Sequence, residues 1–173
     1  MDNKDFGKLF DKIQKLKAGG NLDLSLEEDL SIGIMNLVSL EEHFYFTAEK
    51  TKKPEYFDLM SEAREIRKSL LGRMIDKKEG ETWCISKHLL AATMRLIEVG
   101  TKYRGDGKNE DAKIVFDQAY KLYSMFWGLR LKLVDTAGIK AVGPDQLNTH
   151  DAGSKKPWQA EDIVDKLVDC CNE

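Results

Sequence analysis

Residues 96–119 read LIEVGTKYRGDGKNEDAKIVFDQA, a stretch in which a tight turn separates two helical patterns. Before the turn, apolar residues over about residues 81–102 recur at helical spacing. After the turn, Asn109 is placed to cap a further helix that runs to about Val134. The connection at residues 105–107 (GDG) is short, and we therefore expect the two helices to lie antiparallel.

Two further long helices are predicted upstream of this hairpin. Ser25 stands three residues before Glu28, the spacing of a capping box, and the helix that follows is expected over about residues 26–50. Pro54, a residue favoured at a first helical position, opens a third helix that extends to about Ile75. No run shows the sustained alternation of a strand. The predicted fold is all-α, as an antiparallel four-helix bundle or a helical array.

The ends of the chain predict short amphipathic helices. Residues 135–157 contain glycine and proline with few apolar anchors, and we interpret them as a loop or linker between a helical domain (residues 1–134) and a C-terminal helix (residues 158–173). That C-terminal helix is marginal in water alone, so it docks on the domain, docks on a partner or remains disordered. The N-terminal helix carries an apolar stripe that must pack against another apolar surface. Its residues are Phe6, Leu9, Phe10, Ile13 and Leu16.

Composition excludes several classes of protein. The chain has 173 residues, of which 42% are hydrophobic, and a chain of this size buries roughly 70% of its unfolded surface. A core therefore forms without disulfides or metals. The 27 basic and 30 acidic residues create no broad positive field, which argues against nucleic acid as a partner. The odd count of three cysteines and the absence of a signal-like or membrane-spanning segment favour a cytoplasmic location, without membrane partners.

Small and aromatic residues stand at regular positions across the hairpin: Leu96, Val99, Gly100, Tyr103, Gly107, Ala112, Phe116 and Ala119. Over residues 93–126 this spacing resembles a tetratricopeptide repeat, with Leu96 in place of the tryptophan and Ser124 where the closing proline belongs. Any tight helical hairpin needs small residues at such positions, and no second copy of the repeat pattern occurs one repeat length away in either direction. The resemblance implies protein–protein recognition, not chemistry.

Charged residues lie on the apolar faces of the long helices. Glu41 and Arg67 sit among apolar neighbours, and His88, Arg95 and Glu98 share a face of the fourth helix. Burial of an unpaired charge is costly. We therefore expect structural pairs, Glu41 with Arg67 or Glu98 with Arg95.

The alternative is a bundle that binds a metal or a small ligand, with redox activity as one option. Its ligands would be Glu41, Glu42, Glu62, Glu65 and His88. Di-iron bundles use Glu-x-x-His pairs, and this sequence has none. The nearest nucleophile pattern, Cys84 four residues before His88, lacks a third group to orient the base. The preferred interpretation assigns no catalytic residue, metal or cofactor.

The helices carry more apolar residues than the core of one four-helix bundle can bury. The surplus indicates a non-enzymatic module that contacts a protein partner or forms a homo-oligomer. The residues expected at such an interface belong to the fifth helix and the C-terminal helix. They are Tyr123, Phe126, Trp127, Trp158, Ile163 and Leu167.

Overall fold

The computed structural model describes residues 11, 14–15, 18–19, 23–77 and 81–133. All regular secondary structure within these residues is helical, which confirms the all-α prediction. The linker and the C-terminal helix, with Trp158, Ile163 and Leu167, lie outside the described residues, as does nearly all of the predicted N-terminal helix. The long helices are α2 (Leu24–Thr51), α3 (Glu55–Met74), α4 (Glu81–Gly105) and α5 (Asn109–Arg130).

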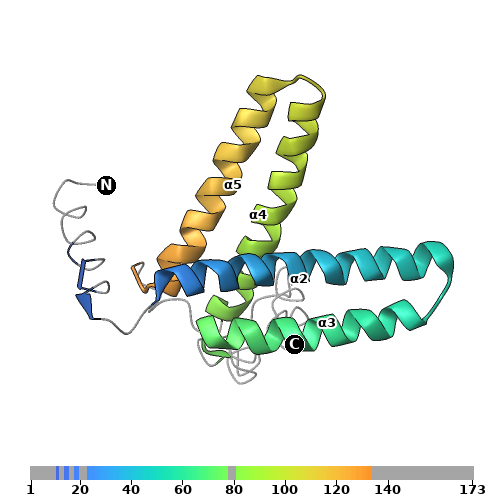
Figure 1. Cartoon of the computed structure of the whole chain (residues 1–173), viewed down its shortest axis with the longest axis horizontal. Helices are drawn as coiled ribbons and strands as arrows, with labels where there is room; N and C mark the ends of the chain where they lie inside the picture. The colour runs from blue at the N-terminus through green and yellow to red at the C-terminus, as the bar shows by residue number, and fades with distance from the viewer. Residues whose placement is uncertain (1–10, 12–13, 16–17, 20–22, 78–80, 134–173) are drawn as a thin grey trace, which may run out of the picture.

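The helices form two antiparallel hairpins that cross each other. Helix α2 packs along α3, and α4 packs along α5, while the main contact between the hairpins joins α2 to α4. In Figure 1 the α2–α3 hairpin runs horizontally, and the α4–α5 hairpin rises steeply behind α2. The ends of both hairpins therefore extend beyond the crossing.

The hydrophobic core lies where the hairpins cross. All four helices contribute to it, but only with the halves that meet at the crossing. Beyond the crossing each hairpin is only a pair of helices, so apolar side chains there have one neighbouring helix at most. The core residues are Ile34, Met35, Leu71, Met74, Ile75, Trp83, Cys84, Leu89, Leu90, Phe126 and Leu129.

The start of α2 corrects one sequence prediction. The N-cap is Asp23, whose carboxylate Oδ1 accepts hydrogen bonds from the backbone nitrogens of Ser25 (3.0 Å) and Leu26 (3.1 Å). Ser25 lies inside the first turn, so the capping-box prediction with Glu28 is wrong. Aspartate is as strong a cap as serine, and it stands two residues earlier.

The bounds of α3 and α5 also differ slightly from the prediction. Pro54 is the N-cap of α3 and not its first helical residue. Lys108 occupies the N-cap position of α5, and the Asn109 side chain instead accepts a hydrogen bond from Arg104 Nη1 at 3.0 Å. Helix α5 ends at Arg130, before the predicted Val134. None of the helices in the described part of the chain has the length and apolarity to cross a bilayer.

Candidate interaction surface

A buried ion cluster holds α2 against α3. The Glu41 carboxylate accepts hydrogen bonds from Arg67 Nε at 2.8 Å and from Arg64 Nε at 2.9 Å. Arg67 is only 1% exposed and Glu41 only 8%. The sequence prediction that Glu41 pairs with Arg67 is confirmed, whereas the contribution of Arg64 was not foreseen, because its own position on α3 is largely exposed.

The geometry of this cluster explains why such polar groups are tolerated in the hairpin. A buried charge is stable only when its partner and further hydrogen bonds replace the water it loses. Glu41 receives two arginines, and Arg67 reaches both oxygens of its carboxylate, since Arg67 Nη2 lies 3.4 Å from Glu41 Oε2. The cluster fixes how α2 and α3 are aligned, and it places charged side chains at the middle of their interface.

Ile34 and Ala48 are buried in line with Glu41, and further apolar side chains of α2 lie beside that line. Leu37, Leu40 and Phe44 recur three and four residues apart and share one stripe of the helix, which Leu26 begins. Leu26 is 65% exposed and Leu40 38%, while Leu37 and Phe44 are half-buried. The stripe is long, apolar and only partly covered.

Helix α3 carries a matching stripe of Leu59, Ile66 and Leu70. Leu59 is 41% exposed and Ile66 55%. The stripes lie on the same side of the hairpin, because Phe44, in the α2 stripe, contacts the ring of Tyr56, three residues before Leu59 (centroids 6.5 Å apart). We call the seven residues the apolar band. They are Leu26, Leu37, Leu40, Phe44, Leu59, Ile66 and Leu70.

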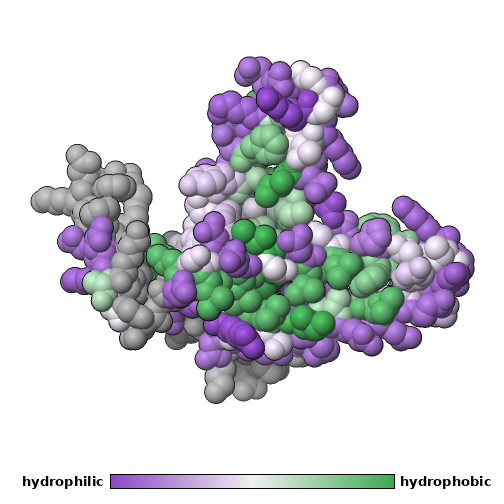
Figure 2. Space-filling view, viewed as in Figure 1, coloured by the Kyte–Doolittle hydropathy of each residue, from purple (hydrophilic) through white to green (hydrophobic). Residues whose placement is uncertain are grey.

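The apolar band faces away from the second hairpin. Figure 2, viewed as Figure 1, shows a continuous hydrophobic patch over α2 and α3 on the side where α2 passes in front of α4. The outer edge of α3 beside this patch is acidic, because Glu55, Asp58, Glu62 and Glu65 follow one another three, four and three residues apart. All four carboxylates are exposed. The surface thus combines an apolar centre with an acidic rim on one side.

An open cleft of about 670 Å³ lies between α2 and α4. Its walls include Phe46 and Met94 as well as Lys50 and Lys102. Arg95, in this cleft, forms an ion pair with Glu42 across the two helices. The predicted alternative pair of Glu98 with Arg95 is therefore replaced by an interhelical one, because the crossing brings α2 closer to Arg95.

The five residues of the alternative metal site do not come together. Glu41 is engaged by the two arginines, Glu42 by Arg95, and Glu65 by Lys68 at 2.9 Å. Glu62 and His88 are both exposed, on α3 and α4 respectively. Among the described residues, no three histidine, cysteine or acidic side chains converge as ligands of one metal ion. Of these residues, Glu41 and Glu42 form ion pairs between helices.

The predicted interface aromatics of α5 are part of the core of this chain. Phe126 is fully buried, and its ring stacks on that of Tyr123 with centroids 6.1 Å apart. Trp127 is half-buried and packs against the same core. The Tyr123 hydroxyl lies 2.6 Å from Ser31 Oγ of α2. Tyr123 thus joins α5 to α2, and the large apolar side chains that α5 exposes are instead Ile114, Tyr120 and Met125.

The α4–α5 hairpin realises the packing expected from its small residues. A Cβ atom at Gly100 would lie 2.5 Å from the Phe116 ring, so only glycine admits that ring without a shift. Ala112 and Ala119 are buried between the helices. Gly107 adopts a positive φ of 75° in the turn, where residues with a side chain are strained.

The acidic rim and the band on α3 were missed by sequence reasoning, although both have a sequence signal. Leu59 and Ile66 recur seven residues apart, directly after Asp58 and Glu65. That pattern marks an apolar stripe beside a charged one, but spacing alone does not show whether a neighbouring helix covers it.

Compared with protein-family models, curated proteins and solved structures, the chain shows no significant match.

Proposed function

We propose that this protein is a non-enzymatic interaction module whose apolar band binds an amphipathic helix, supplied by a partner protein or by a second copy. The exposure of Leu26, Leu40, Leu59 and Ile66 on one face carries the proposal. Contiguous apolar surface on a folded domain marks a site of protein association more often than scattered single residues do.

The shape of the surface favours a helix as the bound element. Two antiparallel helices leave a shallow groove between them, and the side chains of a third helix fit into such a groove. A bound helix would place residues spaced three, four and seven apart over the band. The buried Glu41–Arg67 pair supports this role, because it holds the two walls of the groove in register.

A single substitution tests the proposal. Ile66→Glu places a charge in the middle of the band, and association through the band should weaken about tenfold or more, since the buried side chain loses roughly 2 kcal/mol of apolar contact. The mass in solution should be measured by light scattering over a range of concentrations. Binding of the apolar dye anilinonaphthalene sulfonate provides a second readout of exposed band surface.

Ile114→Glu is the matched control. Ile114, on α5, is 57% exposed, nearly the same as Ile66, but lies outside the band. The control should leave both mass and dye binding unchanged. If Ile66→Glu behaves like Ile114→Glu in both measurements, the band is not an interaction surface and the proposal fails.

A further inference from the structure

We propose that the helix bound by the apolar band is the N-terminal segment of a second copy, residues 4–16, so that two chains exchange their N-terminal segments in a dimer. This inference rests on the proposed function and names its partner. Three properties of the N-terminal segment support it: its charge pattern, its length and the direction in which it would lie along α2.

The N-terminal segment has the charge pattern that the band requires. Lys8, Lys12 and Lys15 are spaced four and three residues apart and would lie along one flank of a helix, where Asp5 is also placed. The apolar stripe from Phe6 to Leu16 lies beside that flank. On the band, the acidic rim is spaced three, four and three residues apart. The flank thus carries three lysines and one carboxylate, and its net positive charge is complementary to the acidic rim.

The lengths also agree. A helix over residues 6–16 spans about 15 Å at a rise of 1.5 Å per residue. Eleven residues of α2, from Leu37 to Thr47, span the same length and include Leu37, Leu40 and Phe44 of the band. The segment therefore covers Leu37 and Leu40 together with Ile66, which lies opposite them on α3.

The direction of the helix selects a second copy over the same chain. When its apolar stripe faces the band, right-handed helical geometry turns the lysines toward α3 only if the segment runs parallel to α2. A segment that folds back onto its own α2 through residues 17–23 runs antiparallel, and its lysines then point away from the acidic rim. A segment from another chain has no such constraint.

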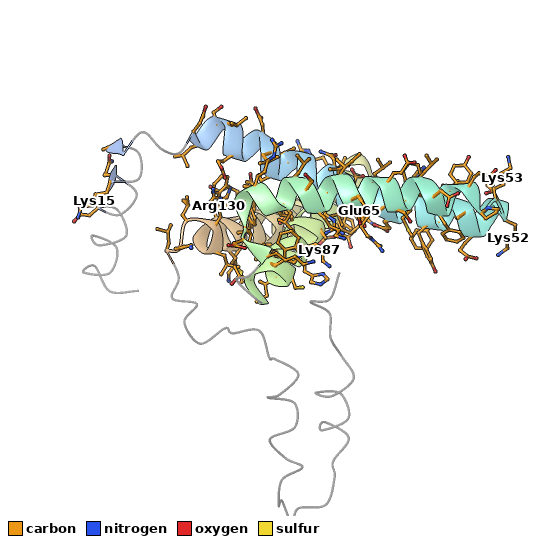
Figure 3. All side chains as sticks on the ribbon, turned by 90° about the horizontal axis from the view of Figure 1, so that it is seen from below. Lys15, Lys52, Lys53, Glu65, Lys87 and Arg130 are labelled. Carbon is orange, nitrogen blue, oxygen red and sulfur yellow. The ribbon has the colours of Figure 1, made fainter. Side chains whose placement is uncertain are left out.

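The described residues of this region agree with an element that reaches outward. Residues 11, 14–15 and 18–19 are all exposed. Lys15 lies well apart from both hairpins, whereas Glu65 lies on α3 (Figure 3). The Lys15 side chain is thus accessible to another molecule.

Charge reversal in the full-length chain tests the inference. One variant carries Lys8→Glu with Lys12→Glu, and the other carries Asp58→Lys with Glu62→Lys. Each variant alone opposes like charges at both contacts of the dimer, and dimerisation should weaken about tenfold. An equimolar mixture forms a heterodimer with two matched contacts, so the mixture should regain the wild-type mass in sedimentation velocity at low salt.

The outcomes separate the inference from the proposed function. If the mixture stays as dissociated as either variant, or if the wild-type chain is a monomer, the exchanged segment is refuted. The proposed function survives that result if Ile66→Glu still lowers dye binding, and fails with it if Ile66→Glu changes nothing. A dimer that dissociates on Ile66→Glu but ignores both charge reversals also refutes the N-terminal segment as the partner.

Glu110→Lys with Asp111→Lys is the control for the rim variant. These carboxylates lie in the first turn of α5, as Asp58 lies in the first turn of α3. The control alters net charge and the helix N-terminus in the same way without touching the band. It should dimerise like the wild type and should not complement the lysine variant.

Discussion

The two hairpins are built from similar helices but are held together by different means. The α4–α5 hairpin packs through small residues, and the Phe116 ring lies directly on Gly100. The α2–α3 hairpin packs through the Glu41–Arg67 pair, with Arg64 as a second donor. Small residues let two helices approach and cover their aromatic neighbours, whereas an ion cluster fills the centre of an interface and leaves leucines beside it.

This difference bears on the apolar band of α2 and α3, although α5 also exposes Ile114, Tyr120 and Met125. Charged groups in the middle of the α2–α3 interface must be enclosed by the aliphatic parts of neighbouring side chains. Leu37, Leu40 and Ile66 flank that centre, and the crossing with α4 covers only the opposite side of the hairpin. The α2–α3 hairpin thus presents an apolar face, the surface that we propose binds a third helix.

The largest expected effect comes from breaking the charge cluster. Glu41→Gln leaves the buried Arg67 without its counter-charge and should lower the free energy of unfolding by about 3 kcal/mol. Urea denaturation measures the change. Glu42→Gln is the matched control on the adjacent residue, whose pair with Arg95 is exposed and contributes about 0–1 kcal/mol. Equal effects of the two variants would show that the cluster does not hold the hairpin.

A smaller effect is expected at the close contact of the other hairpin. Gly100→Ala forces a methyl group into the Phe116 ring, and its cost exceeds the gain in helix propensity by about 1–2 kcal/mol. Gly33→Ala is the control, since a Cβ there meets no atom within 4 Å. It should raise the free energy of unfolding by up to about 1 kcal/mol. Thermal unfolding of the two variants should therefore shift in opposite directions, and stabilisation by both would contradict the tight packing of α4 on α5.

The smallest effect concerns the contact between the hairpins. Ser31 Oγ donates its proton to the Glu28 carbonyl at 2.7 Å, so the Tyr123 hydroxyl donates to Ser31. Tyr123→Phe should cost about 1 kcal/mol in urea denaturation. Tyr120→Phe, whose ring is 74% exposed, should have no measurable effect. A neutral Tyr123→Phe would indicate that apolar packing alone joins α2 to α5.

Several features of the molecule were predictable from local sequence. The turn at Gly107, the close approach at Gly100 and the pairing of Glu41 with Arg67 each follow from a property of the residues themselves. Glycine is required where φ is positive or where a ring leaves no room for Cβ. A glutamate and an arginine that are buried on apolar helix faces each need a counter-charge, and each can supply it to the other. Such local demands are the same in any arrangement of the helices.

Other features were not predictable, because they depend on the crossing of the hairpins. Arg95 pairs with Glu42 and not with Glu98, since α2 passes beside it. Phe126 is covered on all sides, while Ile66, equally apolar, is 55% exposed. Both residues satisfy the helical spacing of a core position, and only the position of a second hairpin distinguishes them.

The amino-acid sequence by itself determined that the chain forms long helices, where they turn, and which charges need partners, because these properties depend on spacing and residue type within a few turns of helix. Only the tertiary structure decided which apolar stripe remains uncovered. Burial is a property of neighbours, and the angle at which two hairpins cross is set by packing between residues far apart in the chain.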